Sequence, residues 1–327
     1  MSKSLLLISK HPQDRAFVST IATTCGLSLK SCDDPQQGAA AVAQQAAGTY
    51  SGIFVDGSDA GFYSKFEAAL QETVGLFSDR LNANQIHFFS DDPFHLTPYL
   101  TESPLMGHFI LRKFDNIEKA ARHYSRIVRL SSAEKEFGLA AFFGPEFKIQ
   151  TVKLLKSSQK QDAVEATRQF LLAAKFQARM ATAIANAVDE VLMNAIYDAP
   201  VDALGKPLHV TAARTTELDL SGPSEVELLL GFDGAHVAIS AIDHYGSLDK
   251  TRLMTHMSNH YATDEYKVKN SKAGAGIGLG TIFKMGGSLL FRSEPQAKTE
   301  ATVIFERKDN HKNFKDQFKF TSTLFYT

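Results

Sequence analysis

The feature that most constrains this chain is a run at residues 274–280, where glycine alternates with small or apolar residues. Glycine lacks a Cβ atom, so main-chain N–H groups in such a run can approach a polyphosphate closely. Residues 281–285 follow with a helical apolar pattern, which would place the phosphates at a helix N-terminus. The run is neither a Walker A loop nor a dinucleotide fingerprint, because the lysine and glycine spacings of those motifs are missing. By itself it predicts either a nucleotide-binding loop or a flexible glycine loop.

A second feature is the stretch 181–195, which is rich in Ala, Val, Leu and Met, lacks Gly and Pro, and predicts a helix. Glu190 and Asn194 are four positions apart and therefore share one helix face. An Asn amide oxygen can bind Mg²⁺, and a carboxylate one turn away can orient or deprotonate a hydroxyl group or water. The alternative is a solvated helix face that carries two polar residues.

A β-hairpin is the third feature, predicted by two strand-like runs, 225–230 and 236–242, around Gly-Phe-Asp-Gly at 231–234. Asp243 ends the second run, where its carboxylate can accept a hydrogen bond from an exocyclic amine in a closed pocket. The alternative is an Asp that only initiates a turn.

In this order the three features resemble the Bergerat-fold ATPases, the superfamily of gyrase, chaperones, histidine kinases and MutL, over about residues 147–307. The resemblance implies ATP and Mg²⁺ as cofactors, with Glu190 as the catalytic residue and Asn194 as the Mg²⁺ ligand. It implies an adenine contact at Asp243. The remaining nucleotide-binding positions are Asn194, Gly246, Gly274, Gly276, Gly278 and Thr299.

Two departures from the family pattern affect this site. Tyr245 and Ser247 stand where the family has the glycines of its first glycine box, and Gly246 lies between them. The basic residue that many kinases of the family carry shortly after the Asn is replaced by Tyr197 and Asp198. The phosphates would then need another cation, for which Lys272 is the candidate.

The branch of the family is indicated by what precedes the helix. A strand near 148–152 and a helix near 163–174 lead directly into the Glu190 motif, as in anti-sigma-factor serine kinases, where this Glu activates a serine hydroxyl of a protein substrate. His123 is the only histidine in the region where a histidine kinase carries its phospho-acceptor, and it lacks the usual acidic neighbour. We therefore expect a surface histidine there, with an atypical histidine kinase as the alternative.

The first third of the chain has a different pattern, with short apolar runs at 5–8, 52–55, 85–89 and 108–111 separated by helix-compatible segments. This alternation predicts a parallel sheet covered on both faces. It resembles a response-regulator receiver domain over about residues 1–125. In that comparison Asp56 is the candidate phospho-acceptor, and Ser90 and Lys113 take the positions of the receiver Ser/Thr and Lys.

The acidic pair that binds Mg²⁺ in receivers is replaced here by Ser9, Lys10 and His11. A site without those carboxylates loses most of its charge for a metal ion. We therefore expect a pseudo-receiver, in which Asp56 is either a residual phospho-acceptor or a plain strand-end Asp.

The fold class predicted is α/β plus α+β, a flavodoxin-like parallel sheet followed by a Bergerat-type α/β sandwich with a mixed sheet. The expected divisions are a receiver-like domain at 1–125, a linker or connecting helix at 126–145, the ATP-binding domain at 146–310, and a tail at 311–327. The tail is expected to add an edge strand, with docking on a partner as the alternative. Lys plus Arg number 35 and Asp plus Glu 36, so no basic surplus predicts nucleic-acid binding. Two cysteines, no signal peptide and no long apolar stretch predict a cytoplasmic protein outside the membrane.

Together these features predict a signalling regulator that binds Mg-ATP and acts as a serine kinase or anti-sigma-like partner-switching protein. Its partner would be a sigma-factor-like or antagonist protein, and both related domain types suggest a homodimer. The alternative is a catalytically inactive pseudo-kinase scaffold that works through protein–protein interaction.

Overall fold

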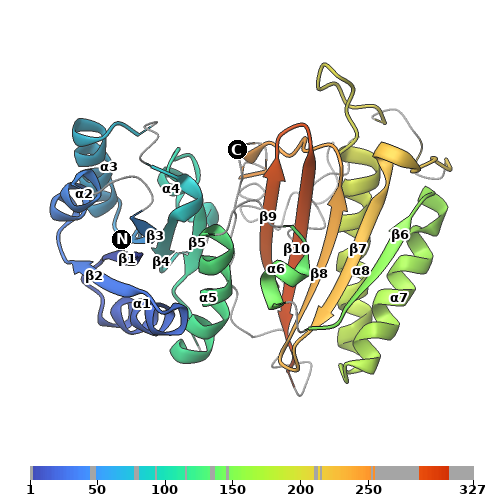
Figure 1. The fold of residues 1–327 in the computed structure, drawn as a ribbon, viewed down its shortest axis with the longest axis horizontal. Coiled ribbons are helices and arrows are strands. Elements are labelled where there is room, and N and C mark those ends of the chain that lie inside the picture. The colour runs from blue at the N-terminus through green and yellow to red at the C-terminus, as the bar shows by residue number, and fades with distance from the viewer. Residues whose placement is uncertain are drawn as a thin grey trace. The chain divides into compact units, whose positions relative to one another are not determined.

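The structure is a computed structural model that describes residues 3–44, 49–76, 81–92, 94–114, 116–132, 137–144, 147–209, 213, 216–251, 253–254 and 287–308. These residues form two compact units, unit 1 up to residue 132 and unit 2 from Phe137 onward (Figure 1). The boundary expected at residue 125 falls inside a helix, α5 (Ile117–Ser132). The segment expected as a linker therefore contains the end of this helix and, in unit 2, α6 (Leu139–Phe143).

Unit 1 is built on a five-stranded sheet in the order β2-β1-β3-β4-β5, and every neighbouring pair is parallel. This confirms the parallel sheet predicted from the apolar runs. The strands are β1 (Ser4–Ile8), β2 (Ser28–Cys32), β3 (Tyr50–Asp56), β4 (Ile86–Ser90) and β5 (His108–Leu111). The helices are α1 (Pro12–Cys25), α2 (Pro35–Ala43), α3 (Ala60–Thr73), the short α4 (Pro98–Thr101) and α5, with 3-10 turns η1 (Ala83–Gln85) and η2 (Phe94–Leu96).

Helices α1 and α5 cover one face of this sheet, and α2 and α3 cover the other (Figure 1). The α1/α5 side contains a stack of aromatic rings in which Phe54 lies over His87 and His87 over His108. His87 is fully buried and its Nδ1 lies 2.9 Å from the Tyr124 hydroxyl. Burial, and then the charge of His108, lower the pKa of His87 well below its ordinary value.

Unit 2 is built on a five-stranded sheet in the order β6-β7-β8-β10-β9. The strands are β6 (Ile149–Leu154), β7 (Val226–Phe232), β8 (His236–Asp243), β9 (Ser288–Glu294) and β10 (Lys298–Glu306). Its other elements are α6, η3 (Ser157–Gln159), α7 (Lys160–Ala173), α8 (Ala178–Met193), a π-helical turn η4 (Asn194–Asp198) and η5 (Gly222–Ser224).

All described strand pairs of unit 2 are antiparallel, so the prediction of a mixed sheet was wrong for this part of the chain. Tight turns explain two of these pairs, because residues 233–235 join β7 to β8 and residues 295–297 join β9 to β10. The β7–β8 hairpin confirms the sequence prediction, although β7 extends to Phe232 and shortens the expected turn.

The two faces of this sheet carry different layers (Figure 1). Alternate residues of β7 point to opposite sides. On one side, the Cβ position of Gly231 meets the ring of Phe143 in α6. On the other side, Phe232 contacts the ring of Phe176, which lies between α7 and α8. The register places Asp243 and Thr299 on the side of α7 and α8.

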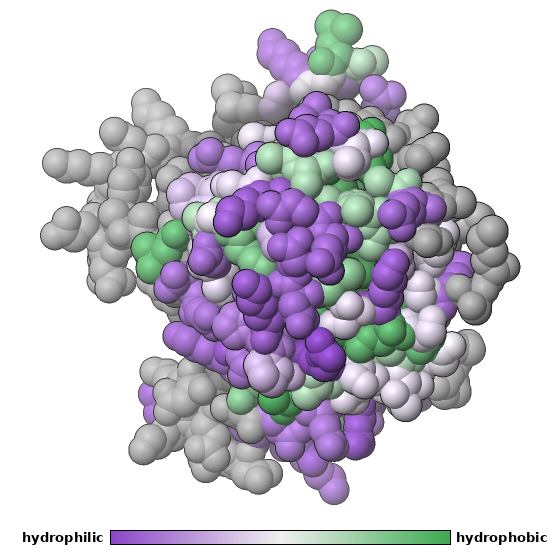
Figure 2. All heavy atoms as spheres, turned by 90° about the vertical axis from the view of Figure 1, so that its left-hand side faces the viewer, coloured by the Kyte–Doolittle hydropathy of each residue, from purple (hydrophilic) through white to green (hydrophobic). Residues whose placement is uncertain are grey.

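The view onto unit 1 shows hydrophilic and apolar residues mixed over short distances (Figure 2). Among the described residues, the large apolar side chains that are exposed are Leu96, Leu155, Leu204 and Leu208. Exposed apolar residues scattered singly need no partner to cover them. None of the described helices has the length and apolar character needed to cross a bilayer.

Candidate functional site

The first candidate site lies at the end of β8 in unit 2, where Asp243 and Thr299 are direct partners across the β8–β10 ladder. Both are buried, with 5% and 6% of their surfaces exposed. The Thr299 hydroxyl has no hydrogen-bond partner among the described residues. Because a buried polar atom without a partner costs free energy, this pair marks a place where a ligand can gain by binding.

The main chain of the loop that follows Asp243 holds its carboxyl group. Its Oδ1 accepts a hydrogen bond of 2.9 Å from the Tyr245 main-chain N–H. Burial raises the pKa of Asp243 to about 7, although the backbone hydrogen bonds from Tyr245 and Gly246 act in the opposite direction. Near neutral pH this side chain can therefore exchange a proton and can either accept or donate a hydrogen bond.

The loop after Asp243 follows a path that requires glycine at position 246. Gly246 has a φ of 58°, and a Cβ atom there would collide with the main chain of Glu294 and Ala297 in the β9–β10 turn. The Tyr245 hydroxyl lies 2.6 Å from Ser224 Oγ, which directs its ring toward η5. The Ser247 hydroxyl donates to the Ala199 carbonyl, 2.7 Å away, and so joins this loop to the end of η4.

The predicted helix is α8, and it continues into the π-turn that begins at Asn194. Glu190 and Asn194 are both partly buried, and η4 packs against β8. The fold therefore brings the helix turn of Asn194 next to the strand that ends at Asp243. The glycine positions 274, 276 and 278, the candidate cation Lys272 and the tail at 311–327 lie outside the described residues.

Glu190 lines a cavity of about 420 Å³ between η3, the start of α7 and the second half of α8. The lining does not include Asn194, Asp243 or Thr299, so this cavity and the Asp243–Thr299 pair are separate. Lys160 forms an ion pair with Asp189 inside it. At its rim, Glu217 accepts a hydrogen bond of 2.6 Å from Ser158 and pairs with Lys156. The arrangement is suited to a polar ligand.

Sequence reasoning missed a cation in this unit. Lys250 follows the Asp243 loop directly and is partly buried. Burial lowers the pKa of Lys250 to about 8. Its position shortly after the predicted adenine contact was a signal that could have suggested it.

A cluster that could hold a metal ion lies among the described residues of the same sheet. Glu225, Glu227 and His244 each offer one ligand atom, and these atoms lie within 4.8 Å of one another. However, Lys153 Nζ already lies 2.7 Å from Glu225 and 4.0 Å from Glu227, so both carboxylates already pair with the lysine ammonium group.

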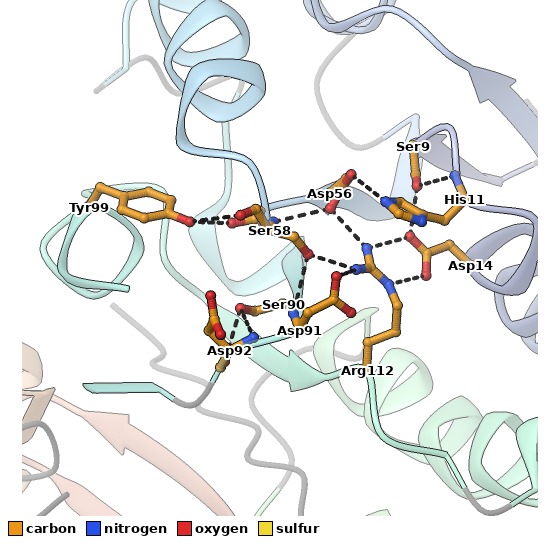
Figure 3. Close-up of polar contacts among 11 residues, drawn as sticks. Ser9, His11, Asp14, Asp56, Ser58, Ser90, Asp91, Asp92, Tyr99 and Arg112 are labelled. Carbon is orange, nitrogen blue, oxygen red and sulfur yellow. Dashed lines mark hydrogen bonds and ion pairs between the residues drawn. The ribbon is translucent and has the colours of Figure 1, made fainter. Parts of the chain in front are cut away.

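Unit 1 carries the second candidate site, at the carboxyl ends of its parallel strands (Figure 3). Asp56 ends β3 and Ser90 ends β4, and both are buried. The Ser90 hydroxyl donates to the Asp92 carbonyl at 2.9 Å. Lys113 is exposed, and the basic residue that enters the site is instead its neighbour Arg112. Side chains alternate along a strand, so Arg112 lies on the same side as Ile110. The ladder partner of Ile110 is Phe89, whose ring contacts Phe17 of α1.

The positions of the expected acidic pair are indeed Ser9, Lys10 and His11, but carboxylates reach this edge from other positions. Asp14, in the first turn of α1, reaches the site together with Asp56 and Asp91. Asp14 was visible in the sequence two positions after Pro12, but nothing local indicates that it points inward. His123, expected at the surface, is buried, so the histidine-kinase alternative lacks an exposed acceptor at this position.

No known protein-family model matches this chain, and a search of curated proteins finds no match either.

Proposed function

We propose that unit 2 binds Mg-ATP and that the chain is a signalling regulator of the anti-sigma serine-kinase type, built on a Bergerat-type ATPase domain. The observation that carries this proposal is the Asp243–Thr299 pair, two buried polar side chains that face one another across adjacent strands, one of them with an unpartnered hydroxyl. An adenine offers an exocyclic amine to such a carboxyl and a ring nitrogen to a hydroxyl.

Three further observations support the proposal. Asn194 begins a helix turn packed on the same strand, and its amide oxygen would be the Mg²⁺ ligand. Glu190, one turn earlier, lines a polar cavity in which a substrate hydroxyl would be deprotonated. In unit 1 the strand order β2-β1-β3-β4-β5 matches the flavodoxin-like order, as a receiver-type domain requires.

The test is calorimetric titration of the full chain with a non-hydrolysable ATP analogue and Mg²⁺. We expect binding in the wild type and a loss of at least about tenfold in Asp243→Ala, since a charged hydrogen bond contributes about 1.5–3 kcal/mol. Ser240→Ala is a matched control on the same strand, because its side chain points to the other face. Absence of binding at millimolar nucleotide in the wild type would refute the proposal.

A second candidate is a scaffold that binds nucleotide without transferring phosphate. The hydrogen bond between Tyr245 and Ser224 favours it, because it holds the side chain that replaces a glycine of the first glycine box in one position. Glu190→Ala separates the two candidates. A kinase loses phosphotransfer to its protein partner in this variant and keeps nucleotide binding, whereas a scaffold keeps its full regulatory output.

A further inference from the structure

The Arg112 guanidinium lies at the centre of three carboxylates in unit 1 (Figure 3). Its Nε and one terminal nitrogen donate to the two oxygens of Asp14, at 2.8 and 2.9 Å. That terminal nitrogen also donates to Asp56 Oδ1 at 2.8 Å. The other terminal nitrogen donates to Ser58 Oγ at 2.6 Å and pairs with Asp91 Oδ2 at 2.9 Å. All five donors of the guanidinium are therefore satisfied.

Arg112 and two of its three carboxylate partners are buried. The side chains of Arg112 and Asp14 have no exposed surface, and that of Asp56 has 7%. Desolvation alone would lower the pKa of Arg112, but the hydrogen bonds and charges of Asp14, Asp56 and Asp91 raise it above its ordinary value. Three carboxylates brought this close repel one another unless a cation lies between them. Oxygen clusters of this kind otherwise gather around Mg²⁺ or Ca²⁺.

The contacts also join the carboxyl-terminal ends of three strands with the segments that follow them. Asp14 lies in the first turn of α1, which follows β1; Asp56 ends β3 and Ser58 follows it; Asp91 follows β4. Ser58 Oγ accepts from both Arg112 and the Asp91 main-chain N–H, the latter at 3.2 Å. A fourth segment is attached through α4, because the Tyr99 hydroxyl donates to the Gly57 carbonyl at 2.7 Å.

We infer that Arg112 is a built-in cation that takes the place of a divalent metal ion and holds these segments in one arrangement. This cluster requires neither a metal ion nor phosphorylation to hold the segments together. Both oxygens of Asp56 are engaged, Oδ1 by Arg112 and the Ser58 N–H, and Oδ2 by His11 Nε2 at 3.2 Å. Unit 1 therefore presents a constant surface, and Asp56 serves as an anchor.

The experiment removes the cation and asks whether a metal ion replaces it. In the nucleotide-free full chain, Arg112→Ala leaves the three carboxylates facing a space that a hydrated Mn²⁺ can enter. We expect Arg112→Ala to bind Mn²⁺ at least about tenfold more tightly than the wild type, measured by the electron paramagnetic resonance of free Mn²⁺. Adding Asp56→Asn to this variant should abolish the gain. A rise in melting temperature with Mn²⁺ should accompany binding in Arg112→Ala alone.

The matched control is Arg15→Ala. Arg15 lies on the same helix as Asp14, one residue away, but is exposed and pairs only with Asp33 among the described contacts, at 3.2 Å. It should gain no Mn²⁺ site. If Arg112→Ala unfolds in EDTA, refolding on addition of Mn²⁺ supports the inference. Equal Mn²⁺ affinity in the wild type and Arg112→Ala, or an Arg112→Ala chain that Mn²⁺ neither binds nor refolds, would overturn it. Nucleotide is absent throughout, so the outcome is independent of ATP binding by unit 2.

Discussion

The Thr299→Val substitution should raise the stability of the nucleotide-free protein and weaken nucleotide binding. Valine has nearly the shape of threonine and replaces the hydroxyl by a methyl group. The Thr299 hydroxyl is buried and has no partner among the described residues, so its removal relieves a desolvation penalty. Such a penalty is about 1–3 kcal/mol. We therefore expect the free energy of unfolding to rise by about 1 kcal/mol and the melting temperature by about 2–4 °C.

The matched control is Thr302→Val, three positions along the same strand. Thr302 Oγ1 lies 2.7 Å from Ser240 Oγ, and both residues are buried. Removing this hydroxyl leaves Ser240 without its partner, so the free energy of unfolding should fall by about 1–3 kcal/mol. The same chemical change on one strand thus has opposite signs, because only one of the two hydroxyls is satisfied within the fold.

Urea denaturation followed by circular dichroism measures both stabilities, and calorimetry measures binding. If the Thr299 hydroxyl contacts the nucleotide, Thr299→Val should weaken affinity about 3–10-fold, the equivalent of one neutral hydrogen bond. Thr302→Val should leave affinity unchanged. A lower unfolding free energy of Thr299→Val without nucleotide would show that the hydroxyl is already satisfied, and the argument for a ligand at this pair would be refuted.

Three other predictions concern stability. Gly246→Ala combines a left-handed φ with a collision against the Glu294 carbonyl, so it should destabilise unit 2 by more than about 2 kcal/mol in urea denaturation. His87 has a lowered pKa in the folded state, so its contribution to stability is complete above about pH 6.5 and is lost as the pH falls toward the folded value. Urea denaturation between pH 5 and 8 should show that the free energy of unfolding falls by up to about 1.4 kcal/mol for each unit that the pH is lowered. In His87→Gln this pH dependence should be smaller. Glu300→Gln removes the carboxylate that lies 3.0 Å from the buried Arg292 guanidinium. Because this leaves a buried charge without its ion partner, the free energy of unfolding measured by thermal unfolding should fall by about 3–5 kcal/mol.

Continuous apolar runs predicted four of the five strands of unit 1 because each is buried on both faces. The fifth, β2, was missed, since its residues are polar and partly exposed at the edge of the sheet. In unit 2, the turn between β7 and β8 was recognisable because a local hairpin depends on neighbouring residues. The direction of the β6–β7 and β8–β10 pairs depends on how distant segments meet, so the prediction of a mixed sheet failed.

The residues of the candidate sites also differ in whether local sequence could predict them. Glu190 and Asn194 were found from their spacing on one helix, which is a local property. The role of Arg112 was not, because its main partner Asp14 lies 98 positions away and neither residue has a sequence pattern that indicates the other. The sequence by itself determined the buried strands of unit 1, the β7–β8 hairpin and the polar residues that end them, because these depend on local periodicity. The tertiary structure decided which charges meet, because burial and pairing depend on segments that come together only when the chain folds.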